Sequence, residues 1–294
     1  MLAAVTSRVA AGENYHHALM MELTARHHPL RSVFNWRLPT LVWLNARPPS
    51  PLWGRTILIL IGVAVIVLWI IVFQQSAPGL AVAAGSLVIL VGVAIPLTVK
   101  STVFFHEMWA GLLIAASLAC WGIGQRKVSL VFAAAALAIR ELALPYVVVM
   151  AAVAWWDTRR SEALAWAGVA LLFAGFWAWH AAEVLSVMPA HGLQTEWIVL
   201  GGWPFVLAAT HTSVFLIPLK DQWVAAATVP IAWAGFWYWP GALGWRLALT
   251  VTGYFALFMI AGRPDNWYWG FLVAPLLPLG FFGFFLGSRV KPIR

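Results

Sequence analysis

Charged residues are scarce in this chain of 294 residues, of which 10% are Asp, Glu, Lys or Arg and 63% are apolar. A soluble domain carries about 25% charged and about 45 to 50% apolar residues. The chain therefore lacks the polar surface of a soluble protein, and this scarcity predicts an integral membrane protein. The 18 basic residues outnumber the 10 acidic ones, but they are scattered and form no basic stripe, so no nucleic-acid partner is expected.

Two further absences narrow the class. The single cysteine, Cys120, lies in an apolar run, which excludes a disulfide framework and a multi-cysteine metal site. No apolar core follows a basic start within the first 50 residues, so we expect no cleavable signal peptide. The apolar runs show no alternation with a period of two residues, which argues against a transmembrane barrel and leaves an all-α fold.

Long apolar runs predict an all-α integral membrane protein with about seven full transmembrane helices, a re-entrant helical hairpin and an extracytoplasmic juxtamembrane helical segment at the N-terminus. Crossing a hydrocarbon core of about 30 Å takes about 20 mostly apolar residues. The expected spans are residues 56–73, 79–97, 108–123, 163–182, 223–238, 247–262 and 267–286.

The hairpin is expected at residues 128–156, where Arg140 and Glu141 interrupt the apolar run. Basic pairs flank this stretch at 126–127 and at 159–160. Because basic flanks favour the cytoplasmic side, both ends are expected on that side. Each arm is too short to cross a membrane, so the stretch is expected to enter and return, with its tip reaching toward the opposite face.

Alternation from this hairpin predicts the remaining topology. Residues 1–54 form an extracytoplasmic juxtamembrane segment, residues 55–288 form a polytopic transmembrane domain, and residues 289–294 form a cytoplasmic tail. Most acidic residues and histidines then fall on the outer face, where we expect the polar chemistry. The expected location is the plasma (inner) membrane, crossed several times.

Short motifs follow one another along most of the chain. They are RVAAGENYHHA at 8–18, FNWRLPT at 34–40, HEMWAG at 106–111, RELALP at 140–145, GWPF at 202–205 and GRPDNWYWG at 262–270. In their order and topology they resemble bacterial membrane glycosyltransferases of the GT-C superfamily. In that family a GE-x-YY-like element and an R-x-P element lie in the first external loop, before a juxtamembrane helix that would correspond here to residues 40–46.

The resemblance implies transfer of a sugar from a polyprenyl-phosphate-linked donor to an acceptor at the extracytoplasmic face. It implies carboxylates that act on the acceptor hydroxyl, for which Glu13 and Glu107 are the candidates, and cations that hold the phosphate. Such enzymes begin with a transmembrane helix and an acidic residue at its outer end, and this chain is expected to start after both. The cofactor stays open, with Mg²⁺ or Mn²⁺ as candidate divalent cations.

The N-terminal candidates are Glu13, Tyr15 and His16. A carboxylate can accept a hydroxyl proton while a neighbouring imidazole supplies a second ligand to an acceptor or a divalent ion. The alternative is that Glu13 only caps or solvates an amphipathic juxtamembrane helix.

His106 and Glu107 are candidates at the outer membrane boundary, and Arg140 and Glu141 are the intramembrane candidates. Glu107 near a helix start suits a phosphate-linked metal or a proton relay, although the positive helix N-terminus alone would favour it. Arg140 is a natural partner for a lipid-borne phosphate because its guanidinium is planar and permanently charged. A purely structural ion pair is the alternative for Arg140 and Glu141.

The last candidates are Arg263 and Asp265, in a short loop before an aromatic belt. Arg263 is expected to contact the donor phosphate, and the alternative is a simple turn followed by interface aromatics. His27, His28 and His211 receive no expected role.

Two other classes of function stay open. The first is a non-catalytic membrane scaffold or an inactive truncated relative. A transporter is less favoured, because internal hydropathy repeats are not evident and, apart from the hairpin, neither are ionisable residues near the midplane. The expected partners are the lipid-linked sugar donor and membrane lipids, and neither the sugar, the acceptor nor the oligomeric state follows from the sequence.

Overall fold

The computed structural model describes residues 1–47, 52–76, 79–98, 100–191, 193, 198–213 and 222–286, and within these ranges it contains helices and no strands. The elements are α1 (Leu2–Ala10), α2 (Tyr15–Ala25), η1 (Val33–Asn35), α3 (Thr40–Ala46), α4 (Leu52–Ser76), α5 (Leu80–Thr98), η2 (Lys100–Phe104), α6 (His106–Gly122), α7 (Arg126–Ile139), η3 (Glu141–Ala143), α8 (Leu144–Trp156), α9 (Arg160–Val187), α10 (Gly202–Ser213), α11 (Gln222–Trp237), α12 (Gly241–Ala261), η4 (Pro264–Leu272) and α13 (Leu277–Leu286). The predicted all-α fold is thus confirmed.

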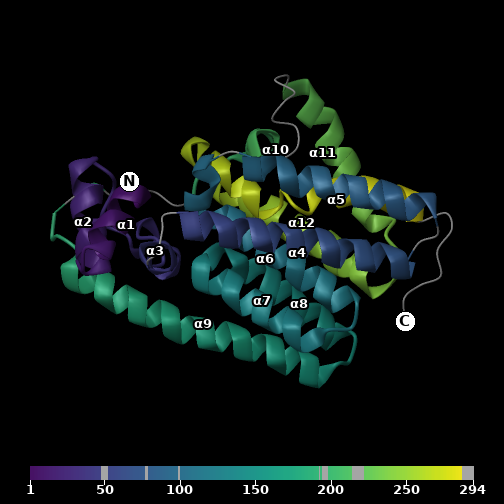
Figure 1. Cartoon of the computed structure of the whole chain (residues 1–294), viewed down its shortest axis with the longest axis horizontal. Helices are drawn as coiled ribbons and strands as arrows, with labels where there is room; N and C mark the ends of the chain where they lie inside the picture. Colours follow the sequence, from purple (N-terminus) through teal and green to yellow (C-terminus); the bar gives the residue numbers. More distant parts are fainter. Residues whose placement is uncertain are drawn as a thin grey trace.

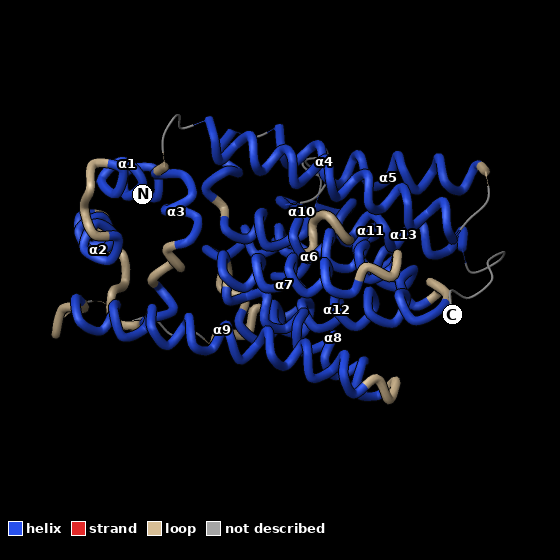
Figure 2. Tube along the Cα trace, turned by 60° about the horizontal axis from the view of Figure 1, so that its bottom comes forward, coloured by secondary structure: helices blue, strands red, loops and turns tan. Residues whose placement is uncertain are grey.

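The short helices α1, α2 and α3 gather at one end of an elongated bundle, and the long helix α9 runs along one edge from the far end to this N-terminal group (Figure 1). Figure 2 shows α4 and α5 side by side along the opposite edge. The N-terminal helices have a small core of their own, which includes Val5, Leu19 and Trp36 and which Val184 of α9 joins. The N-terminal segment is therefore folded against the end of α9.

Helix α6 forms the centre of the bundle, and every residue from His106 to Trp121 is buried. It packs against α4, α7 and η4. Gly111 allows α6 and η4 to pack closely together, since a Cβ atom there would lie 2.2 Å from the carbonyl oxygen of Phe271. A glycine is needed at this position because any side chain would push η4 away from α6.

The two ends of the predicted hairpin lie at the same end of the bundle. The guanidinium carbon of Arg126, at the start of α7, lies 3.5 Å from the ring centroid of Trp121, and that of Arg159, just after α8, lies 5.7 Å from it. Arg246 of α12 stacks on the same indole at 3.8 Å. We call this the Trp121 end. Between the two arms Arg140 is extended and ends α7, so the charged break turns the chain back.

Among the described residues, three helices are long and apolar enough to cross a membrane, judged by length and composition: Trp53–Ser76, Arg160–Val187 and Gly241–Ala261. The pair Pro264–Leu272 and Leu277–Phe284, bent by 55°, raises the number to four if it is one span. Further apolar helices are shorter, at Leu80–Ala94, Glu141–Trp156 and Trp223–Trp237. A membrane protein is therefore supported, while the predicted number of seven spans remains a prediction.

Some predicted boundaries changed or fall outside the described residues. The last span was expected to run unbroken over 267–286, but it bends after η4, where Pro275 removes a backbone donor. The stretch between the predicted spans 163–182 and 223–238 contains α10, whose Trp203 packs against Trp233 and Phe255 in the aromatic core. The predicted cytoplasmic tail, 289–294, lies outside the described residues.

Candidate functional site

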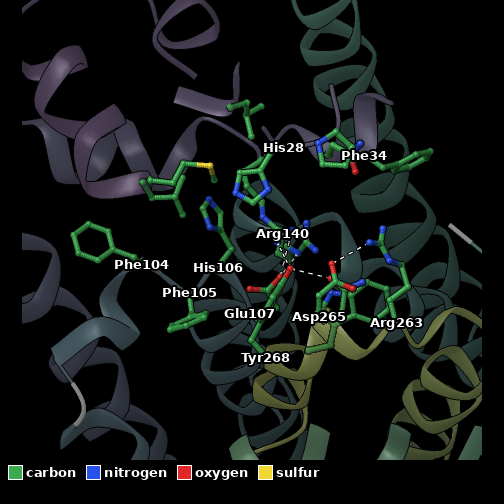
Figure 3. Close-up of a pocket in the computed structure, with 18 of the residues that line it drawn as sticks. His28, Phe34, Phe104, Phe105, His106, Glu107, Arg140, Arg263, Asp265 and Tyr268 are labelled. Carbon is green, nitrogen blue, oxygen red and sulfur yellow. Dashed lines mark hydrogen bonds and ion pairs between the residues drawn. The ribbon is translucent and has the colours of Figure 1, made fainter. Parts of the chain in front are cut away.

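A cavity of about 540 Å³ opens where the N-terminal segment meets the start of α6, the break after α7 and the segment after α12 (Figure 3). The charged side chains of its lining are three arginines and two carboxylates, namely Arg37, Arg140, Arg263, Glu107 and Asp265. These side chains carry one positive charge in excess, and residues more than 200 positions apart in the sequence contribute to the lining. We call this region the pocket end of the bundle.

Glu107 is the centre of the charged cluster. Its side chain is 2% exposed, and its Oε1 atom lies 2.7 Å from Nε of Arg140 and 3.5 Å from Nη1 of Arg37. The 2.7 Å contact is an ion pair whose geometry is too bent for a hydrogen bond, since neither atom has a hydrogen-bond partner among the described residues. Arg140 also pairs with Glu141. A buried carboxylate shared by two guanidiniums stays ionised, and it holds both arginines at the cavity wall.

Arg37 links the N-terminal segment to the end of the chain. Its Nη2 atom donates a hydrogen bond of 2.7 Å to the hydroxyl of Tyr268, which donates one of 3.0 Å to Oδ1 of Asn266. The backbone carbonyl of Arg37 accepts a hydrogen bond of 2.5 Å from the hydroxyl of Tyr15. Nearby, the hydroxyl of Thr40 donates to the carbonyl of Ala138 near the end of α7. These hydrogen bonds hold residues 37–40 in place beside the cavity.

Arg263 and Asp265 form the exposed edge of the cluster. Nη2 of Arg263 lies 3.0 Å from Oδ2 of Asp265, and the two side chains are 24% and 64% exposed. Figure 3 shows the pair beside the Glu107 and Arg140 cluster, on the side opposite Phe104. An ion pair this open to solvent contributes little to stability and exchanges partners readily. Arg263 is therefore free to turn toward an anionic ligand.

His106 has an unsatisfied nitrogen at the cavity. Its Nε2 atom is buried and has no hydrogen-bond partner within the described ranges. A neutral imidazole nitrogen is either a donor or an acceptor, so Nε2 can form one hydrogen bond with a ligand in the cavity. His28 also lines the cavity and lies close to His106 in Figure 3.

Aromatic side chains form the apolar side of the site. Phe104 and Phe105 line the cavity. The ring of Phe105 packs at centroid distances of 5.8 Å from Tyr268 and 5.3 Å from Phe271. Phe34 lines the cavity on the side of the N-terminal segment. The cavity thus combines cations on one side with hydrocarbon on the other.

The N-terminal candidates lie outside this cavity. Glu13 pairs with Arg8 and with His17 at 2.7 Å and 2.9 Å, and the Arg8 and His17 hydrogen bonds lower its pKa. Tyr15 is buried, and that burial raises the pKa of its hydroxyl. His16 is buried against His180, with 3.1 Å between its Nε2 atom and Nδ1 of the partner ring. Their predicted roles in binding or catalysis remain predictions.

The cavity brings together five of the predicted site residues, which are His106, Glu107, Arg140, Arg263 and Asp265. Glu141 is joined to them through Arg140. The sequence-based prediction missed Arg37, Tyr268 and His28. Arg37 lies in the R-x-P motif, which was a signal for it, but neither Tyr268 nor His28 stands out from neighbouring aromatics and histidines in the sequence.

No group of three or more His, Cys, Asp or Glu side chains in the described part of the chain is placed to hold a metal ion. No known protein family, curated protein or solved structure matches the chain. Any functional assignment therefore depends on the chemistry of the cavity and on the motifs.

Proposed function

We propose that the chain transfers a sugar from a polyprenyl-phosphate-linked donor to an acceptor at the extracytoplasmic face of the plasma membrane. The observation that carries the proposal is the buried carboxylate of Glu107, which holds Arg37 and Arg140 at the wall of an open cavity. Three guanidiniums suit a phosphate, because each offers several donors in a fixed plane. The similarity of the motifs to GT-C glycosyltransferases supports the same assignment.

The shape of the site fits a lipid-borne donor. The arginines can bind the phosphate, and Phe104 and Phe105 form an apolar wall for the first prenyl units. In the proposed topology the seven predicted helices span the membrane and the pocket end faces outward. The hairpin of α7 and α8 then enters from the cytoplasmic side and presents Arg140 at its tip.

The proposed reaction forms a bond between the acceptor oxygen and the anomeric carbon of the sugar. The bond between that carbon and the phosphate oxygen breaks, and its electron pair leaves with the polyprenyl phosphate, which Arg37, Arg140 and Arg263 hold. The acceptor proton passes to the carboxylate of Glu107 as the new bond forms. His106 precedes Glu107 at the start of α6, and its unpartnered Nε2 atom can hydrogen-bond the acceptor hydroxyl.

The experiment is binding of farnesyl phosphate, a short soluble prenyl phosphate, to the full chain in detergent micelles. Farnesol, which lacks the phosphate, is the matched ligand control. We expect Arg140→Gln to weaken farnesyl phosphate binding about tenfold to hundredfold, since a charge-assisted hydrogen bond contributes about 1.5 to 3 kcal/mol. The matched variant Arg26→Gln, an exposed arginine paired with Glu22, should bind as the native chain does.

Two results would refute the proposal. Equal affinity for farnesyl phosphate and farnesol would show that the arginines do not bind the phosphate group. Phosphate-dependent binding without transfer from any polyprenyl-phosphate sugar in a panel of hexose and pentose donors would favour a non-catalytic scaffold.

A further inference from the structure

A second cavity of about 520 Å³ lies between α8 and α12, at the Trp121 end. Its walls are mostly apolar and include Ala152, Val153, Trp156, Trp245 and Leu249. Arg246 and Asp157 complete the lining. None of these residues belongs to the pocket end, and the proposed sugar transfer does not use them.

The charged residues of the lining lie toward one end of the cavity. On α8 the lining runs from Ala152 to Asp157, just beyond the end of the helix, and on α12 it runs from Leu249 back to Ala242, near the start of that helix. A helix rises about 1.5 Å per residue, so the walls extend roughly 8 to 10 Å along both helices. Asp157 and Arg246 therefore lie toward the end of the bundle, and we call this part of the cavity its mouth.

The buried cation at the mouth is incompletely satisfied. Arg246 is 0% exposed, donates from Nη1 to the carbonyl of Ala242 and lies 3.0 Å from Oδ2 of Asp157 through Nη2. Its Nε atom is buried and has no hydrogen-bond partner in the part of the chain that the structure describes. A buried guanidinium donor without a partner costs free energy, so an acceptor supplied by a ligand would stabilise it.

The surroundings of the mouth are cationic. Five basic residues lie in and around the ends of α7, α8, α9 and α12, against the two carboxylates Asp157 and Glu162; the five are Arg126, Lys127, Arg159, Arg160 and Arg246. Three positive charges are thus in excess. Arg160 lies three positions after Asp157, and its guanidinium stacks 4.0 Å from the ring centroid of Trp155. Arg160 is exposed, so its positive charge is accessible to an anion.

Exposed tryptophans place this mouth at the depth of lipid headgroups. Trp155, Trp156 and Trp245 are 54%, 87% and 58% exposed. Indole rings concentrate at the boundary between hydrocarbon and water, because one edge is apolar and the N–H group is polar. α12 is also one of the helices long and apolar enough to cross a membrane.

We propose that this second cavity binds an anionic phospholipid, with part of one acyl chain between α8 and α12 and its phosphate at the mouth beside Arg246 and Arg160. The apolar walls take hydrocarbon, and the excess of arginine selects an anionic headgroup over a neutral one. Basic pockets between transmembrane helices are suited to such headgroups.

The test is a thermal-unfolding titration of the full chain in neutral detergent, with phosphatidylglycerol, phosphatidylcholine and glycerol 3-phosphate as probes. We expect phosphatidylglycerol to raise the unfolding midpoint with an apparent dissociation constant about tenfold lower than that of phosphatidylcholine. Glycerol 3-phosphate, which has the phosphate without the chains, should give no comparable shift. Equal stabilisation by the two phospholipids would overturn the proposal, and an equal shift with glycerol 3-phosphate would replace it with a free-phosphate site.

The variants locate the effect. Ala152 is exposed and lines the cavity, whereas Ala134 is exposed on α7 and does not. Ala152→Phe fills the cavity and should weaken phosphatidylglycerol binding about tenfold, while Ala134→Phe should leave it within about twofold.

Arg160→Gln, which removes one charge without filling the cavity, should weaken binding about fivefold. Native phosphatidylglycerol affinity in both Ala152→Phe and Arg160→Gln would rule out this site. Farnesyl phosphate binding by Ala152→Phe stays at the native value, which separates this site from the pocket end.

Discussion

The pocket end and the Trp121 end of the bundle both bury arginines beside carboxylates, yet their polar atoms are satisfied to different degrees. At the Trp121 end, Arg126 and Arg246 stack on the faces of one indole, and the N–H group of Trp121 donates a 2.6 Å hydrogen bond to Glu162. At the pocket end, His106, Glu107 and Arg140 each leave a buried nitrogen or oxygen without a hydrogen bond within the described residues. At the Trp121 end Nε of Arg246, a residue that lines the second cavity, is left in the same state. The pocket end therefore keeps more polar atoms available for a ligand than the Trp121 end does.

The largest effect is expected from removing the shared carboxylate at each end. Glu107→Gln removes the proposed proton acceptor, so sugar transfer should fall by about 10² to 10⁴-fold. It also removes one of the two carboxylates beside the buried Arg140 and the one beside the partly buried Arg37, so the unfolding free energy should fall by at most about 3 to 5 kcal/mol. Glu162→Gln, the matched change at the Trp121 end, should lower stability but leave transfer unchanged. The checks are transfer assays and denaturant unfolding of both variants.

The opposite outcome would reverse the functional assignment of the two ends. Transfer that survives Glu107→Gln but fails in Glu162→Gln would move the site to the Trp121 end. Transfer that fails only in Glu13→Gln would place the proton acceptor in the N-terminal segment, at the other of the two carboxylates predicted from the sequence.

Acid should loosen the pocket end before the Trp121 end. His16 is buried against His180, and burial together with the charge of that ring lowers the pKa of His16 to about 4. Between pH 6.5 and 4 the unfolded chain therefore binds a proton that the folded chain does not, so stability is complete above pH 6.5 and falls as the pH drops toward 4. The loss is at most roughly 3 kcal/mol.

Hydrogen exchange across this pH range measures that loss directly. Exchange should rise in α2 and in the last turns of α9, and less in the first turns of α9, where Arg159 and Glu162 pair. His16→Asn removes the titrating ring and should flatten the dependence. A uniform rise along the whole of α9 would show that the pair of histidines does not control this contact.

Helix α6 offers a smaller test of how tightly each end is packed. A Cβ atom at Gly111 would lie 2.2 Å from the backbone oxygen of Phe271, whereas one at Gly122 would lie 2.9 Å from the flexible side chain of Leu243. Gly111→Ala should therefore cost about 1 to 3 kcal/mol of unfolding free energy, and Gly122→Ala should cost less. Equal costs, measured by thermal unfolding, would show that η4 is not held tightly below the pocket.

The smallest effect is expected at the exposed edge of the pocket. Arg263 is 24% exposed and pairs with the exposed Asp265, so its contact with a phosphate is partly screened by water. Arg263→Gln should weaken farnesyl phosphate binding about threefold to tenfold, less than Arg140→Gln. An effect larger than that of Arg140→Gln, measured by titration calorimetry, would make the exposed edge the principal phosphate contact.

The sequence predicted the helical class and much of the pocket because charges in apolar runs are conspicuous. Arg140 and Glu141 interrupt an otherwise apolar stretch, and the structure ends α7 at that break. His106 and Glu107 precede a long apolar run and begin α6. The physical reason is common to both, since a charge can be placed in such a run only where it finds a partner.

Other features depend on tertiary packing and were not predictable in the same way. Arg37 is one of several arginines in the N-terminal segment, and only its contacts with Glu107 and Tyr268 distinguish it. The second cavity depends on how α8 and α12 meet, which no local pattern encodes. The bend after η4 had a local signal in Pro275, but apolarity alone predicted a continuous span.

The most direct test of the central claim is an experimental structure of the full chain with farnesyl phosphate bound. The account predicts the phosphate within hydrogen-bond distance of Arg37 and Arg140, with the prenyl chain along Phe104 and Phe105 and Nε2 of His106 facing the ligand. A phosphate bound at the Trp121 end instead, or Arg37 and Arg140 without any contact to the phosphate at saturating ligand, would contradict it.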